Sequence, residues 1–257
     1  MIKGGKMKLI EKIKEYINSK NEVISTSDNV SDLYLKIIQE FYEYRSLYLE
    51  EAQKLNGHTH FKTKEVQEKV ISLINEDERV LFIRDDCGRH IGFDACKLKL
   101  EDVVIRVLEN DKVSLIQDNA GYNLGMMSAI YGLDKSTLKA LDNNKASLQQ
   151  NNLGNNIGMY ASSNCSEEVT LKALENNEAS IQQEENGYNI GMICAQNGLK
   201  QATFKALDNT AARNQVDKFN LNIIDHMELN LNNKFTNDEI KLAINLCKED
   251  VSFEVEN

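Results

Sequence analysis

Proline and tryptophan are absent from this 257-residue sequence, and it contains no long apolar run. A bilayer-spanning helix needs roughly 18 to 20 consecutive apolar residues, so the sequence predicts no membrane span. The first residues, MIKGGKMKLIEKIKEYINSK, are basic but lack the continuous apolar core and the small-residue cleavage site of a secretory signal. We therefore expect a cytoplasmic protein.

Cysteine and positive charge are also scarce. The five cysteines are odd in number, widely spaced and form no CxxC pair, which argues against a disulfide framework and against a structural zinc site. Lys and Arg total 30 against 40 Asp and Glu, and all ten excess negative charges lie in residues 85–257. Because binding to phosphates needs clustered basic side chains, we expect no nucleic-acid partner.

The sequence does contain a 33-residue repeat. Each unit carries the pattern G-x-N-x-G-M-x-A-A, then a loop, then T-L-K-A-L-D/E-N-N-x-A-S-x-Q-Q. Self-similarity at a fixed period of 20 to 50 residues indicates a stacked array, so we predict an all-α fold. The glycines that keep the 33-residue step are Gly88, Gly121, Gly154 and Gly187, and again Gly92, Gly125, Gly158 and Gly191.

Each unit is predicted to hold two helices joined by a turn at a glycine such as Gly132 or Gly198. The asparagine of G-x-N-x-G is placed to cap the first helix, and leucines three residues apart give the second helix an apolar face. A later asparagine follows the last apolar residue, where a left-handed C-terminal cap is expected. The N-terminal caps are Asn123, Asn156 and Asn189, and the expected C-terminal caps are Asn143, Asn176 and Asn209.

This layout resembles the ankyrin repeat, whose unit reads G-x-T-P-L-H-x-A-A-x-x-G before a second helix. Gly187 matches the hairpin glycine, Cys194 and Ala195 match the small pair, and Gly198 matches the turn glycine. Thr-Pro-Leu-His is replaced by Asn-Leu-Gly-Met or Asn-Ile-Gly-Met, so asparagine capping substitutes for the preset proline start. The resemblance implies an α-solenoid of helix-turn-helix repeats that binds proteins.

Three regions follow from this alignment. Residues 85–217 are predicted to form four ankyrin-like repeats (about 86–118, 119–151, 152–184 and 185–217), and 218–257 a degenerate C-terminal capping repeat with an acidic tail. Residues 1–84 are expected to form an N-terminal helical cap. Its expected helices are an amphipathic segment from Met7 to Ile17, a helix from a Ser31 cap to Asn56-Gly57 and a helix from a Thr63 cap to Asn75, while Thr236 and Glu239 form a capping box for the last helix.

Signals for chemistry are weak, and we expect no catalytic residues, no metal and no cofactor. The recurrence of the glycines argues against a phosphate-binding loop, because no lysine follows as in a P-loop. His58 and His60 have no evident third ligand for a metal. A Cys87–His90 pair could form a nucleophile, but His90 holds the cap position of the first repeat.

Exposed positions of the repeat carry the functional signal. In the ankyrin layout, the residues one, six, nine and ten after the hairpin glycine face outward on the concave side, where this sequence places apolar and aromatic residues. A shifted register, or coverage by the N-terminal helices, would bury them instead. Together with two nearby acids, the predicted partner-binding residues are Tyr122, Met127, Ile130, Tyr131, Tyr160, Tyr188, Ile193, Glu184 and Glu185.

These positions predict a protein-interaction scaffold that binds a basic or mixed-charge protein, with no enzymatic activity. Two alternatives stay open at this point. One is an inhibitor or immunity-type protein that blocks a basic site on one cognate partner. The other is a bacterial effector with an activity in its N-terminal region, since ankyrin proteins of host-associated bacteria are often delivered into host cells.

Overall fold

The computed structural model describes residues 28–52, 59–230 and 234–253, which form helices joined by turns and contain no strand. This confirms the predicted all-α class. By internal contacts, the chain divides into two compact units, Met1–Val107 and Leu108–Asn257, and this division falls inside the first predicted repeat. Among the described residues, no helix combines the length and the apolar character needed to cross a membrane.

The first unit packs two long helices against shorter ones. α2 and α3 contact each other and both contact the 3-10 helix η1, and α2 also contacts α4. Buried apolar side chains such as Leu33, Ile37 and Ile74 fill the interior. The Gln67 side chain on α3 joins the next helix, because it accepts from the Asp102 backbone and donates to the Asp102 carboxylate, both at 2.9 Å. The elements are α2 (Asp28–Ala52), α3 (Thr59–Glu76), η1 (Glu78–Phe82), α4 (Ile91–Lys97) and α5 (Glu101–Leu108).

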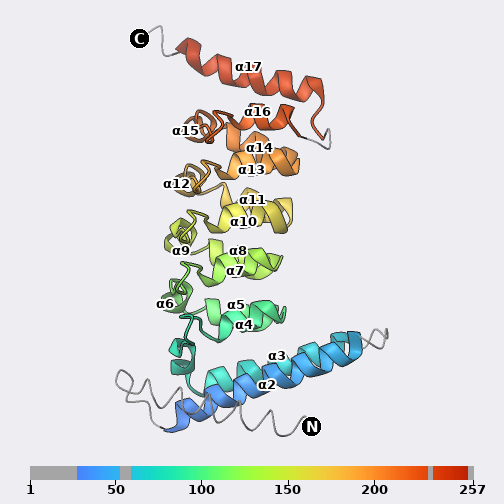
Figure 1. Cartoon of the computed structure of the whole chain (residues 1–257), viewed down its shortest axis with the longest axis vertical. Helices are drawn as coiled ribbons and strands as arrows, with labels where there is room; N and C mark the ends of the chain where they lie inside the picture. The colour runs from blue at the N-terminus through green and yellow to red at the C-terminus, as the bar shows by residue number, and fades with distance from the viewer. Residues whose placement is uncertain (1–27, 53–58, 231–233, 254–257) are drawn as a thin grey trace. The chain divides into compact units, whose positions relative to one another are not determined.

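The second unit repeats a group of three helices. The first helices stack on one another, as do the second helices, and the short third helices lie in a separate column (Figure 1). After the short α6 (Asp111–Ser114), the groups are α7 (Leu124–Ile130), α8 (Asp134–Leu141) and α9 (Asn144–Leu148); α10 (Ile157–Asn164), α11 (Glu167–Ala173) and α12 (Asn177–Ser180); and α13 (Ile190–Asn197), α14 (Lys200–Leu207) and α15 (Thr210–Arg213). The unit ends with α16 (Ile223–Glu228) and α17 (Asn237–Phe253).

Glycines set the turns and the close packing of the first helices. Gly187 has φ +87° at the hairpin, in the left-handed region that other residues rarely adopt. Gly191 lies on α13, where an added Cβ would come within 2.5 Å of the Ile223 Cδ1 and 2.7 Å of the Ala206 Cβ. Both roles, turn and packing, are therefore structural, and neither glycine belongs to a phosphate loop.

The third helix of each repeat corrects one prediction. The asparagines expected as left-handed C-terminal caps have φ near −90° and instead cap the N-terminus of the short helix that follows. Asn176, for example, accepts from the backbone N–H groups of Glu178 and Ala179, both at 3.1 Å. Asparagine suits both positions, so its identity alone did not separate them. The three corrected residues are Asn143, Asn176 and Asn209.

Predictions near the chain ends fared unevenly. Ser31 and Thr63 lie inside helices that begin at Asp28 and Thr59, so neither is a cap, because the helical backbone continues upstream of both. The capping box at Thr236 is confirmed: its N–H donates to Glu239 Oε2 at 2.7 Å, and Glu239 N–H donates back to Thr236 Oγ1 at 3.2 Å. The Met7–Ile17 helix and Asn56-Gly57 lie outside the described residues, as do the side chains of His58 and His60.

Candidate functional site

A network of buried amides repeats through the second unit and fixes its helices. In the middle repeat, Asn156 accepts from the Met159 N–H at 3.0 Å and donates to the Ala179 carbonyl at 2.9 Å and to Gln182 Oε1 at 2.8 Å. Gln182 in turn donates to the Leu148 carbonyl of the preceding repeat at 2.8 Å. Equivalent bonds are made by Asn123 with Gln149 and by Asn189 with Gln215.

Because their side-chain amides are paired within the chain, these asparagines are structural. The residues with a functional assignment must therefore lie at positions that the network does not use. The tyrosines and apolar residues predicted at the outward-facing positions are half-buried, neither sealed in the core nor fully in water.

Two of the predicted tyrosines meet in one cluster. The Tyr160 hydroxyl lies 3.2 Å from the Tyr122 hydroxyl, and their ring centroids are 5.9 Å apart. Asn151, at the start of the hairpin before α10, donates to the Tyr160 hydroxyl at 2.8 Å. Burial, followed by the bond to Tyr122, raises the pKa of Tyr160, so this hydroxyl stays protonated. We call Tyr122, Asn151 and Tyr160 the first aromatic cluster.

The third predicted tyrosine belongs to an equivalent group. The Tyr188 ring lies 5.3 Å from the His226 ring, centroid to centroid. His226 Nε2 is 3.1 Å from Asp217 Oδ2, and its Nδ1 is 3.3 Å from Gln196 Nε2. A neutral imidazole that carries its proton on Nε2 satisfies both contacts. We call Tyr188, Asp217 and His226 the second aromatic cluster.

Asp217 is fixed as an anion at this cluster. Burial acts to raise the pKa of Asp217, but hydrogen bonds from the backbone N–H groups of Leu221 and Phe219, together with His226, outweigh it and lower the pKa. The carboxylate thus shapes the hairpin with one oxygen and orients the imidazole with the other.

The remaining predicted residues divide into two groups. Met127, Ile130, Tyr131 and Ile193 are half-buried along α7 and α13, and Ile193 packs against the apolar core. The two acids differ from each other. Glu184 is held within its hairpin, because it accepts from the Asn186 and Tyr188 N–H groups at 2.8 and 3.2 Å, whereas Glu185 is exposed.

Three residues of the two clusters escaped sequence analysis: Asn151, Asp217 and His226. Asn151 and Asp217 share one repeat position and begin their hairpins. His226 falls 33 residues after Ile193, in a unit whose sequence has diverged so far that the alignment kept only its cap, Asn222. Continuing the 33-residue step across that unit would have placed His226 in the predicted surface.

The Cys87–His90 pair is not assembled as a nucleophile. His90 Nδ1 accepts from the Gly92 N–H at 3.2 Å, which confirms its predicted role as a cap. Burial, followed by the nearby Arg84 charge, lowers the pKa of His90 to about 3. The buried ring is therefore neutral, and a neutral imidazole does not lower a thiol pKa as imidazolium does.

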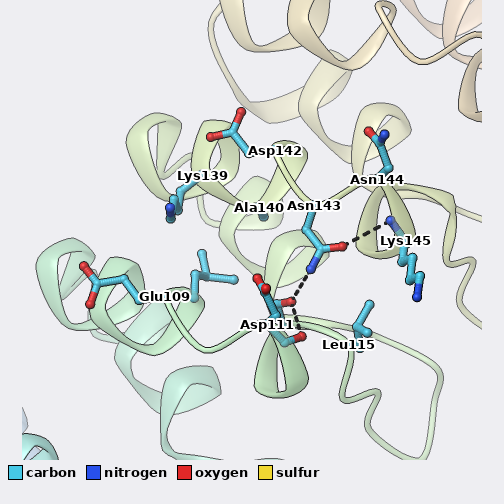
Figure 2. A pocket seen from close by; sticks show the side chains of 11 residues that line it. Glu109, Asp111, Leu115, Lys139, Ala140, Asp142, Asn143, Asn144 and Lys145 are labelled. Carbon is cyan, nitrogen blue, oxygen red and sulfur yellow. Dashed lines mark hydrogen bonds between the residues drawn. The ribbon is translucent and has the colours of Figure 1, made fainter.

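A pocket on the second unit lies away from the predicted residues. It encloses about 440 Å³ between the ends of the second helices and the starts of the short third helices. Figure 2 shows Asn143 at its centre, with Lys139 and Glu109 at its edge. The Asn143 amide donates to Ser114 Oγ at 2.9 Å, so this polar group is used by the repeat. Among the predicted partner-binding residues, none lines this pocket.

Comparison with known proteins returns no relative. No protein-family model matches the chain, and no curated protein has a matching sequence. The described residues also contain no group of three or more His, Cys, Asp or Glu side chains placed to hold a metal ion. Function must therefore be argued from the arrangement of the side chains themselves.

Proposed function

We propose that the chain is a protein-binding module built from ankyrin-like repeats, and that it binds a partner without chemistry of its own. The proposed surface is formed by the first helices and the hairpins that precede them. Stacked repeats hold these side chains in fixed relation, so little conformational entropy is lost when a partner binds.

One observation carries the proposal. The buried amide network explains the residues that recur in each repeat, yet half-buried aromatic and apolar side chains occupy positions that change from repeat to repeat. None of the twelve outward-facing positions of residues 119–217 holds a charged residue. Interface centres share this composition, because they are depleted of charge and enriched in tyrosine and methionine.

Affinity capture tests the proposal. The full-length protein is compared with the triple variant Tyr122→Ala, Tyr160→Ala, Tyr188→Ala as bait in a lysate of the native organism, and bound proteins are identified by mass spectrometry. We expect a partner that the wild type retains and the triple variant loses, because tyrosines supply much of the binding energy of an interface.

A second variant separates binding from folding. Tyr122→Phe with Tyr160→Phe keeps both rings but removes the hydroxyl contacts, and it is measured beside the triple variant by thermal unfolding. A triple variant that stays folded and still retains the same proteins as the wild type would refute the proposed surface. A triple variant that fails to fold would show that these tyrosines belong to the core.

A further inference from the structure

The two aromatic clusters are copies of one another, displaced by two repeats. Tyr122 and Tyr188 are 66 residues apart, as are Asn151 and Asp217, and as are Tyr160 and His226. In each cluster a hairpin residue hydrogen-bonds a ring nine residues later, and that ring contacts a tyrosine of the preceding repeat. The aromatic arrangement thus follows a two-repeat period within a one-repeat frame.

Two repeat positions alternate to produce this period. The residue before the cap is Tyr, Asn, Tyr and Leu in successive repeats, and the fourth residue of the first helix is Met, Tyr, Ile and His. Where the first position is a tyrosine, the next repeat supplies the second ring. The intervening pair, Asn155 and Ile193, has no aromatic ring. The alternating residues are Tyr122, Asn155, Tyr188 and Leu221 at the first position, and Met127, Tyr160, Ile193 and His226 at the second.

The spacing of the clusters follows from helix packing. Tyr160 lies on α10 and His226 on α16, and α13 contacts both helices. Packed helices lie about 8–10 Å apart, so two steps separate the clusters by about 16–20 Å. An extended peptide advances about 3.3 Å per residue and covers that distance in about five or six residues.

Charge indicates what surrounds the bound segment. The outward-facing positions between the clusters are uncharged, such as Ser163, Asn164, Gln196 and Asn197, and all four are exposed. Residues 108–257 as a whole hold 21 Asp and Glu against 12 Lys and Arg. A segment with uncharged residues at the contact and basic residues in its flanks complements this distribution.

Resting on the proposed function, we infer that the two clusters form one bipartite site for an extended protein segment, which carries two bulky aromatic or apolar side chains about five or six residues apart. Each such side chain packs on one pair of rings, Tyr122 with Tyr160 or Tyr188 with His226. The amides between the clusters face the polar backbone of the segment.

A displayed library of random peptides of about 16 residues, long enough for two anchors and both flanks, tests the inference on the immobilised full-length protein. We expect the retained peptides to share two bulky side chains at that separation. Changing either anchor to alanine in a synthetic peptide should weaken binding about tenfold or more. This measurement does not depend on any variant of the protein.

Matched variants assign the anchors to the clusters. Tyr122→Ala and Tyr188→Ala occupy equivalent positions and should each weaken binding about tenfold, whereas Tyr42→Ala, an exposed tyrosine of the first unit, should not. A peptide that has already lost one anchor should become insensitive to one of the two variants and remain sensitive to the other.

The outcomes separate the two proposals. Peptides that depend on a single cluster, or whose anchors show no fixed separation, would overturn the bipartite site and leave the binding surface standing. If the wild type retains no peptide at all, the result counts against both the bipartite site and the proposed function.

Discussion

At the scale of the residue, asparagine has a specific task in this protein. The sequence contains 30 asparagines, and the second unit uses them to cap first helices, to cap third helices and to join neighbouring repeats. A side-chain amide can accept from one segment while it donates to another, which no hydroxyl or carboxylate does in both directions with the same reach. The caps therefore replace the proline that the sequence lacks.

Removing one buried cap tests this role. Asn156→Ala loses the bond from the Met159 N–H and leaves the buried Ala179 carbonyl without this donor. We expect the free energy of unfolding to fall by about 2–4 kcal/mol, as a lost cap and an unpaired buried group together cost. Urea denaturation measures the change. The neighbouring Asn155→Ala is the control and should change stability by less than about 0.5 kcal/mol; equal losses in the two variants would contradict the assignment.

His90 adds a dependence on pH that the asparagine caps lack. Its pKa is lowered to about 3 by burial and by Arg84, whereas an unfolded histidine titrates near 6.5. Between these values the unfolded chain binds the extra proton, so stability falls as the pH drops below about 6.5 and stops falling near 3. The expected slope is at most about 1.4 kcal/mol per pH unit.

The variant His90→Asn isolates this contribution. Unfolding free energies of both proteins are measured by urea denaturation at about pH 7.5 and about pH 5, and groups common to both proteins cancel. The loss of stability between the two pH values should be smaller in the variant by about 2 kcal/mol. An identical loss in both proteins would mean that His90 is protonated in the folded state.

At the scale of the element, each repeat depends on how closely its first helix approaches the next. The tight contact is between Gly191 and Ile223, where the absence of a side chain makes room for the Ile223 Cδ1. Helix propensity favours alanine over glycine by about 1 kcal/mol, while overpacking a core costs about 1–3 kcal/mol. Packing and propensity therefore oppose each other, and the 2.5 Å approach decides for packing.

We expect Gly191→Ala to lower the free energy of unfolding by about 1–3 kcal/mol despite its better helix propensity. Ile223→Val removes the Cδ1 methyl that the new Cβ would meet. In that background the cost of Gly191→Ala should shrink but not vanish, because the Ala206 Cβ is also close. A double-mutant cycle by urea denaturation measures the coupling, and additive costs would rule out this contact as the cause.

The elements also mark how far sequence reasoning reached. The first-helix caps and the turns at Gly132 and Gly198 were predicted correctly, since each feature recurs and depends on residues close in sequence. The third helix was missed because asparagine suits both a left-handed C-terminal cap and an N-terminal cap, and only the continuing backbone decides between them. His226 was missed because its partners, Asp217 and Tyr188, are joined to it only when the repeats stack.

At the scale of the whole molecule, net charge and the candidate surface act on different steps of binding. The second unit is acidic, but the charged residues lie outside the twelve outward-facing positions of residues 119–217. Long-range attraction raises the rate of encounter with a basic partner and is screened by salt. Once the partner is bound, uncharged aromatic contacts hold it, and these depend weakly on ionic strength.

Binding kinetics test this division, with a synthetic peptide from the library as the probe. Between about 50 mM and about 500 mM salt, the association rate constant should fall about tenfold while the dissociation rate constant changes by less than about twofold. An inhibitor whose acids fill a basic site would behave differently, because salt would then speed dissociation as well. Glu184 already bonds its own hairpin, so its carboxylate is poorly placed for that role, and a steep rise in dissociation with salt would overturn the uncharged site in favour of the inhibitor.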